Sequence, residues 1–288
     1  MKSNIAVILK ESLYDKVTTS KASLVNADDL KQLKKSHIEN QENQELLINF
    51  LEQNGFKFKT FKNSEIKSSL TSTNTFMLDE FNLVISAGGD GTYLHSAFHL
   101  KKAHLIGFNS SPNFSVGFYC IREFEELRKT LIQYSEGKAD EFLKLIRIEA
   151  AINQKVIPLL SLNDILFTNL NPSSSTDYKL EINGKIEQQS SSGIWISTPS
   201  GSSGAISAAG GLIDSIENER FQYLVRETDK AYSFKHGFLK QNEELCIHSL
   251  SNKNAIYIDG NSKAIEVSYG DRIRIKISDV PLITRLSN

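Results

Sequence analysis

Short apolar runs in the first half of the chain predict strands that are buried on both faces. The run Asn4–Leu9 ends abruptly in charged residues, which is typical of a strand in a parallel sheet. We interpret residues 56–61 and 81–86 as two further strands, and residues 103–108 as another short buried strand. The first predicted helix begins after Asp28 or Asp29, either of which can cap it, and ends at Gly55. Two further helices are predicted over 92–102 and 122–134. This alternation of strands and helices predicts an α/β domain with a Rossmann-like parallel sheet.

The hydrophobic period changes after about residue 138. Apolar and polar side chains alternate over 145–152, 178–182, 264–267 and 272–277, a pattern that indicates antiparallel strands with one solvated face. Asn183-Gly184 is a strong signal for a hairpin turn. We therefore predict two domains: an α/β domain at 1–138 and a mostly antiparallel, β-rich domain at 139–288, with the last residues able to pack back on the first domain.

Composition and charge narrow the classes of protein. The 288 residues are 40% hydrophobic and 23% charged, as in an ordinary globular protein, and the net charge of −1 argues against a broad surface for nucleic acid or an anionic membrane. Cys120, Cys246 and six scattered histidines do not make a disulfide framework or a zinc motif, so we expect no protein-built metal site. No apolar run reaches the roughly 18 residues needed to cross a bilayer, and we expect a cytoplasmic protein.

The first candidate site reads Ser-Ala-Gly-Gly-Asp-Gly-Thr over Ser86–Thr92. It follows a predicted buried strand and precedes a predicted helix, which is where open α/β sheets bind ligands. The amides of Gly88, Gly89 and Gly91 can approach a phosphate, and the helix N-terminus adds its dipole. Asp90 would repel a phosphate unless it binds a cation or accepts a proton, so it is a candidate general base. The alternative is a tight turn in which Asp90 caps the helix.

Two polar segments of the second half are further candidates. Asn163 and Asp164 interrupt an apolar run that we interpret as a strand over 161–167, and both can grip vicinal hydroxyls; a β-bulge or a turn is the alternative. The Ser/Gly-rich segment 190–211 has the composition of a flexible linker. Because it also contains the strand core Ile194–Ile196 with the only tryptophan, we interpret it as a binding loop.

Taken in order, these segments resemble the motif series of the NAD kinases. The resemblance rests on Gly88–Thr92, Asn163-Asp164, Ser197–Ser202 with Gly210-Gly211, and Asp259-Gly260. It spans nearly the whole chain. The first motif is shared with diacylglycerol, sphingosine and phosphofructokinase relatives, whereas the combination is far more specific. The sequences of residues 106–112 and 188–193 are more similar to those of the mitochondrial-type NAD kinases and their bacterial relatives than to those of the common bacterial form.

The resemblance implies a fold of the NAD kinase and diacylglycerol kinase type. It also implies transfer of the γ-phosphoryl group of ATP, bound with Mg²⁺, to the 2′-hydroxyl of the adenosine ribose of NAD, giving NADP. It implies Asp90 as the catalytic base and a homo-oligomer, either a dimer or a tetramer. The residues that it implies for binding ATP or NAD are Gly88, Gly89, Gly91, Thr92, Asn109, Asn163, Asp164, Ser192, Thr198, Ser200, Ser202 and Ser203.

Two departures from the family pattern concern the dinucleotide. Common NAD kinases carry Gly-Asp-Gly where this chain has Ser191-Ser192-Gly193, so an acidic contact is missing. They carry Ser-Thr-Ala-Tyr where it has Ser202–Ala205, so an aromatic wall is missing. Two alternatives therefore stay open. One is a lipid kinase of the diacylglycerol type, which shares the Gly-rich loop, and the other is a catalytically weak NAD(P)-binding sensor.

Overall fold

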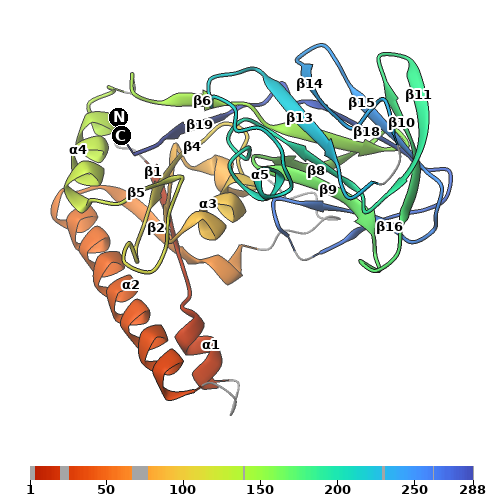
Figure 1. The fold of residues 1–288 in the computed structure, drawn as a ribbon. Coiled ribbons are helices and arrows are strands. Elements are labelled where there is room, and N and C mark those ends of the chain that lie inside the picture. Colours follow the sequence, from red (N-terminus) through yellow and green to blue (C-terminus); the bar gives the residue numbers. More distant parts are fainter. Residues whose placement is uncertain are drawn as a thin grey trace. The chain divides into compact units, whose positions relative to one another are not determined.

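The computed structural model describes residues 4–19, 26–66, 77–138, 140–228, 231–261 and 263–287. The chain divides into two compact units: the first comprises Met1–Lys144 with Leu282–Asn288, and the second comprises Leu145–Pro281. The first unit carries a sheet of parallel strands with helices, and the second carries antiparallel sheets (Figure 1). The predicted fold class is confirmed.

The sheet of the first unit has the order β2-β1-β3-β4-β19-β6, and β5 also pairs with β4. Its strands are β1 (Asn4–Leu9), β2 (Lys57–Lys62), β3 (Leu83–Ala87), β4 (His104–Phe108), β5 (Cys120–Ile121), β6 (Leu143–Leu145) and β19 (Leu282–Arg285). The helices are α1 (Leu13–Thr19), α2 (Ala27–Gln53), α3 (Asp90–Ala97) and α4 (Phe124–Ser135), with 3₁₀ turns at Asn63–Glu65 and Met77–Glu80. Because β1 and β4 both pair with β3 in parallel, the carboxyl ends of these three strands lie at one edge of the sheet.

The core of the first unit lies between the sheet and helices α2 and α4. Side chains that alternate along β1, β3 and β4 pack against apolar residues of α2 and α4: Ile5, Val7, Leu83, Ile85, Ile106, Phe108, Leu47, Phe50, Leu51, Leu127 and Leu131. The apolar spacing that predicted α2 supplies its buried face. Ile106 and Phe108 of β4 face α2 and α4, so Gly107 between them faces the opposite side of the sheet. Tyr93 of α3 packs over Gly107 on that side. Helices therefore cover both faces of the sheet (Figure 1).

Helix ends differ from the sequence-based prediction. The N-cap of α2 is Asn26, whose side chain accepts a hydrogen bond from the Asp29 amide, so neither Asp28 nor Asp29 is the cap. Helix α3 begins at Asp90 and ends at Ala97, five residues short of its predicted end at 102. Helix α1 was not predicted, because its seven residues carry little apolar periodicity.

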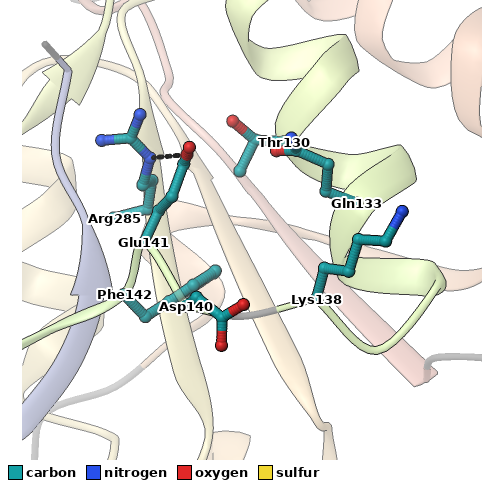
Figure 2. A pocket seen from close by; sticks show the side chains of 7 residues that line it. All are labelled: Thr130, Gln133, Lys138, Asp140, Glu141, Phe142 and Arg285. Carbon is teal, nitrogen blue, oxygen red and sulfur yellow. Dashed lines mark ion pairs between the residues drawn. The ribbon is translucent and has the colours of Figure 1, made fainter.

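The C-terminal strand β19 belongs to the first unit. Thr284 and Arg285 pair in parallel with Leu105 and Ile106 of β4. The Arg285 side chain is only 9% exposed; its Nε lies 3.1 Å from Glu141 Oε2 and its Nη2 lies 3.8 Å from Glu126 Oε1. Figure 2 shows Arg285 and Glu141 together at one side of a pocket of about 170 Å³, with Lys138 across from them. These ion pairs connect β19 to α4 and to the segment before β6.

The second unit contains two six-stranded antiparallel sheets within the described ranges, with the orders β11-β10-β15-β18-β7-β8 and β14-β13-β12-β9-β16-β17. Their strands are β7 (Ile148–Ile152), β8 (Lys155–Ser161), β9 (Asp164–Asn169), β10 (Thr176–Ile182), β11 (Lys185–Ser191), β12 (Ile194–Ser197), β13 (Arg220–Val225), β14 (His236–Lys240), β15 (Leu245–Ser249), β16 (Asn254–Ile258), β17 (Ile265–Val267) and β18 (Arg272–Ile277). A short helix, α5, spans Ala205–Ala208.

The two sheets of the second unit contact each other through aromatic side chains. The ring of Phe167 on β9 meets the ring of Tyr178 on β10 edge to face, with centroids 5.6 Å apart. The predicted hairpin turn at Asn183-Gly184 is confirmed: both residues have positive φ, 50° and 75°, and they connect β10 to β11. Across the described residues, no helix is long and apolar enough to span a membrane.

The buried hydroxyl of Thr284 provides a test of how β19 is held. Its Oγ1 lies 2.6 Å from the Tyr93 hydroxyl and donates to the Leu105 carbonyl at 2.8 Å. We expect Thr284→Val to lower the free energy of unfolding of the first unit by about 1–3 kcal/mol, because buried polar groups lose a partner. Thr18→Val is the matched control in an exposed helix, with an expected change of about 0.5 kcal/mol or less. Equal effects of the two variants in denaturant unfolding would contradict this description of β19.

Candidate functional site: a glycine-rich loop and a buried carboxylate pair

The glycine-rich loop connects β3 to α3 at the carboxyl edge of the parallel sheet. The Gly88 amide donates to the Phe108 carbonyl at 2.9 Å, which ties the loop to β4. A Cβ at Gly88 would lie 2.5 Å from Thr92 Oγ1, and a Cβ at Gly89 would lie 2.5 Å from Ser115 Oγ. Packing against Thr92 and Lys10 therefore favours glycine at position 88, whereas at position 89 only the Ser115 hydroxyl would have to move. At Gly91 a Cβ would meet nothing within 4 Å, so the protein itself does not require glycine there.

Asp90 is the first residue of α3, and its carboxylate contacts the segment before β5. Oδ2 accepts a hydrogen bond from the Phe118 amide at 3.0 Å, and Oδ1 accepts one from the Tyr119 amide at 2.9 Å. The N-cap of α3 is Gly89, with no side-chain cap. The helix-cap alternative for Asp90 is therefore wrong. A carboxylate offers about four acceptor positions, so the two amides leave Asp90 able to accept a further proton donor.

Two other predicted residues of the first unit make contacts within the protein. Thr92 is buried in the first turn of α3. Asn109, at the end of β4, is also buried; its Nδ2 donates to the Ser115 carbonyl at 3.0 Å, and its Oδ1 accepts from the Ser111 amide at 3.2 Å. The Asn109 side chain thereby braces the loop 109–117, and a contact between Asn109 and a ligand stays a prediction.

Lys10 is a candidate that the sequence analysis did not single out. It directly follows β1, its amide donates to the Ala87 carbonyl at 3.0 Å, and its Cβ lies 3.0 Å from the position of a Cβ on Gly88. In the described part of the chain its ammonium forms no ion pair. It lines a pocket of about 460 Å³ together with Ser12, His37 and Gln44. A charged residue directly after a buried strand is the signal that could have identified it.

In the second unit, the carboxylate of Asp259 organises the segment 161–164. It accepts hydrogen bonds from the amides of Leu162 at 2.8 Å and of Asn163 and Asp164 at 2.9 Å each. It also accepts one from the Ser161 hydroxyl at 2.5 Å. Asp259 and Gly260 have φ of 45° and 68°, and the Asn261 amide donates to the Ile258 carbonyl, as in a type I′ turn. The Asp259-Gly260 motif therefore supplies both a turn and an anchor.

The loop after β12 packs on the same segment. The hydroxyls of Thr198 and Ser200 donate to the Leu162 carbonyl, and the Thr198 amide donates to the Asn163 carbonyl at 2.9 Å. At Gly201 a Cβ would lie 2.2 Å from the Asn163 carbonyl oxygen, so only glycine allows this approach. The structure thus brings together three of the segments that carry the sequence motifs: 161–164, 197–201 and 259–260.

The remaining predicted serines lie in different settings. Ser202 is buried, and its hydroxyl donates to the Pro199 carbonyl at 2.6 Å and accepts from the Asp214 amide at 2.9 Å. Ser203 is exposed. Ser192 is partly exposed, its amide donates to the Arg226 carbonyl, and its side chain hydrogen-bonds Glu227, which lowers the pKa of that glutamate. The carboxylate of Glu227 therefore lies beside Ser192, the position where common NAD kinases carry an aspartate.

Asp164 differs from these residues because its carboxylate receives no hydrogen bond from the described part of the chain. The residue is 7% exposed. Burial, and then the nearby charge of Asp259, raise its pKa to about 7. A buried acceptor without a donor is costly for the protein alone, and a ligand hydroxyl would satisfy it.

The structure corrects the predicted strand over 161–167. Strand β8 ends at Ser161 and β9 begins at Asp164, so Leu162 and Asn163 form a tight turn, which was the alternative interpretation. The segment 190–211 is not a linker. It contains part of β11, the whole of β12, the hydroxyl-bonded loop and α5.

Comparison with known proteins agrees with this arrangement. Residues 4–139 match the family model of the ATP-NAD kinase N-terminal domain. This match covers just under half of the chain and makes it similar to the NAD kinases over its N-terminal part. A probable NADH kinase of Oryza sativa subsp. japonica is 28% identical over 72% of this chain and 71% of its own length. An NAD kinase of Delftia acidovorans is 26% identical over 78% of this chain and 72% of its own length.

Solved structures of an NAD kinase and an NADH kinase share the fold of this chain. An NAD kinase from Archaeoglobus fulgidus, in complex with ATP, has a TM-score of 0.68 and 19% identity over 98% of this chain and 92% of its own. Yeast NADH kinase, complexed with NADH, has a TM-score of 0.67 and 17% identity over 100% of this chain and 84% of its own. At these identities the likeness shows the fold.

The two glycines 88 and 91 allow packing to be separated from ligand binding. We expect Gly91→Ala to leave the thermal stability unchanged or slightly higher, because its methyl group meets no protein atom and alanine favours the helix. If its amide lies against a phosphate, the same methyl group raises the KM for ATP at least several-fold. Gly88→Ala, the matched variant, should lower stability, because its methyl group overlaps Thr92. An unchanged KM for ATP in Gly91→Ala would show that no phosphate approaches that position.

Proposed function

We propose that this chain transfers the γ-phosphoryl group of ATP to the 2′-hydroxyl of the adenosine ribose of NAD, giving NADP. The match of residues 4–139 to the ATP-NAD kinase family model and the shared fold support this activity. The observation that carries the chemistry is the position of Asp90, a partly exposed carboxylate at the start of α3 directly after a glycine-rich loop. The relatives and structures named above are NAD and NADH kinases, and they give no support to a lipid kinase or a sensor.

Asp90 is the proposed general base. The amides of Phe118 and Tyr119 fix its orientation, while acceptor positions remain for the attacking hydroxyl. Accepting that proton as the oxygen attacks the γ-phosphorus is the task that the base has in this reaction. The amides of Gly88, Gly89 and Gly91 are proposed to hold phosphate oxygens at the N-terminus of α3.

Lys10 and Mg²⁺ are proposed to offset the phosphate charge. Lys10 follows β1 beside Gly88 and forms no ion pair with the residues that the structure describes, so its ammonium is available to a phosphate oxygen. Those residues hold no cluster of three or more His, Cys, Asp or Glu side chains suited to a metal ion. Mg²⁺ that enters on ATP would be held mainly by the phosphate oxygens and water, so Asp90 stays available as the base. The ion then supplies charge neutralisation between the phosphates and Asp90.

Asn163 and Asp164 are proposed to bind the ribose hydroxyls of NAD. The Asp164 carboxylate is buried and lacks a donor in the described ranges, which suits it to vicinal hydroxyls. Thr198, Ser200 and Ser202 hold the adjoining loop in place through their hydroxyls, and any direct contact with NAD is a further proposal. Contacts of Ser192, Ser203, Thr92 and Asn109 with NAD or ATP are likewise proposals.

A cytoplasmic location and assembly into a dimer or tetramer remain expectations from the sequence.

Substitution of Asp90 tests the proposed base. We expect Asp90→Asn to retain nucleotide binding and to lower turnover by roughly 10² to 10⁴, because the amide cannot accept the proton. The assay supplies ATP, Mg²⁺ and either NAD or NADH; NADP formed from NAD is detected through a coupled dehydrogenase that reduces it, and NADPH formed from NADH through one that oxidises it. Asp79→Asn is the control: Asp79 also accepts backbone amides, those of Lys101, Lys102 and Ala103, but lies outside the loop. Near wild-type turnover in Asp90→Asn would leave the proposal without its base.

A further inference from the structure

The second unit contains two buried carboxylates whose roles differ. Asp259 is fully engaged: four donors, three of them consecutive backbone amides, contact its two oxygens. The Asp164 carboxylate accepts no hydrogen bond from the described residues, although the residue is buried, with only 7% of its surface exposed. The two residues are also joined through the main chain, since the Asp259 amide donates to the Asp164 carbonyl at 2.9 Å. One carboxylate is thus an anchor, and the other is left for a ligand.

The anchor determines the shape of the ligand-facing segment. The consecutive amides of 162–164 would have to point into a buried space without acceptors if Asp259 were absent, because the adjoining loop uses the carbonyls of this turn and not its amides. Asp259 therefore fixes the backbone at Asn163 and Asp164. The four hydrogen bonds of the Asp259 carboxylate show that it points into this segment from the turn at 259–260.

The anchor also acts electrostatically on Asp164. Strand β9 pairs with β12 through Ser197 opposite Asp164, and Ile258 of β16 lies opposite Ile165, so the neighbouring strand positions are uncharged. Among the described residues, Asp259 is the ionisable group that acts on Asp164, and it works in the same direction as burial. Both disfavour the ionised form of Asp164. An ionised carboxylate accepts hydroxyl hydrogen bonds more strongly than a neutral one.

We propose that Asp259 is a positioning residue of the dinucleotide site, which fixes Asn163 and Asp164. Through its effect on Asp164 it also makes the affinity for NAD increase as the pH rises from 6 to 8. This inference rests on the proposed function, in which Asp164 accepts hydroxyls of the NAD ribose. Ionisation of Asp164, with a pKa of about 7, is the switch. Below this pH the carboxyl group is neutral and binds NAD weakly. Above it the carboxylate binds NAD at full strength, and by linkage bound NAD lowers the pKa of Asp164.

The test is the affinity for NAD, measured by calorimetry without ATP at pH 6 and pH 8, so that titration of the ATP phosphates and Mg²⁺ does not contribute. About one tenth of Asp164 is ionised one pH unit below its pKa, so wild-type affinity should be roughly tenfold weaker at pH 6 than at pH 8. Asp164→Asn should bind NAD weakly and equally at both pH values. Equal wild-type affinity at the two pH values would overturn the inference.

Asp259→Asn separates a positioning role from a purely structural one. It should weaken NAD binding and also move the midpoint of the pH dependence to lower pH, because the charge beside Asp164 is gone. Weaker binding with an unmoved midpoint would overturn the electrostatic role. Asp271→Asn is the matched control, since Asp271 is another turn carboxylate that accepts a backbone amide, that of Ser268 at 2.7 Å, and it should leave the midpoint and affinity unchanged.

Ser161→Ala provides a second variant if Asp259→Asn does not fold. It removes only the hydroxyl that donates to Asp259 and keeps both charges. We expect NAD affinity to fall several-fold with the midpoint retained, and unchanged affinity would contradict the anchoring role. The NADP assay at pH 8 distinguishes the two levels of failure. NADP formation with pH-independent NAD affinity refutes this inference alone, whereas absence of NAD binding and of NADP at either pH refutes the proposed function.

Discussion

The parallel pairing of β1, β3 and β4 is the constraint on which the site of the first unit depends. Because these strands run in one direction, their carboxyl ends meet at one edge of the sheet, where Lys10, the glycine-rich loop and Asn109 follow them in turn. The sheet is held from both sides, by the apolar faces of α2 and α4 and by α3. The loop itself has little freedom, since Gly88 and Gly89 are closely packed against Thr92 and Ser115. The loop that we propose to bind phosphate is therefore preorganised by the sheet beneath it.

Both units hold a functional segment by means of a carboxylate that accepts backbone amides. In the first unit Asp90 accepts two amides, and its remaining acceptor positions are the ones that we propose for a substrate hydroxyl. In the second unit the two tasks are divided: Asp259 accepts the amides, and Asp164 is left as the acceptor for a ligand. Burial raises the pKa of both carboxyl groups: at Asp259 the hydrogen bonds from its four donors act against this rise, whereas at Asp164 the charge of Asp259 adds to it and the pKa is about 7.

Much of this organisation could be predicted from the sequence because it follows from periodicity and turn chemistry. The apolar runs identified β1, β3 and β4, the alternating segments identified the antiparallel strands, and Asn183-Gly184 identified its hairpin. Three features depend on contacts between distant residues and could not be predicted in this way. Asp90 contacts amides 28 and 29 residues away, Asp259 contacts a segment nearly 100 residues before it, and the four-residue strand β19 has no periodicity of its own. The sequence pattern predicts one strand interrupted by Asn163-Asp164, because apolar residues lie on both sides of this pair. In the structure the chain bends there between two strands, β8 and β9.

The central claim, phosphoryl transfer to a ribose hydroxyl, is tested most directly by the chemical identity of the product. The purified protein is incubated with NAD, Mg²⁺ and ATP labelled in the γ-phosphoryl group, and the dinucleotide product is examined by phosphorus NMR and mass spectrometry. The account predicts that the label appears as a phosphomonoester on the 2′-oxygen of the adenosine ribose, together with an equal amount of ADP. Release of the label as inorganic phosphate alone, or its appearance at any other position of the dinucleotide, would contradict the account.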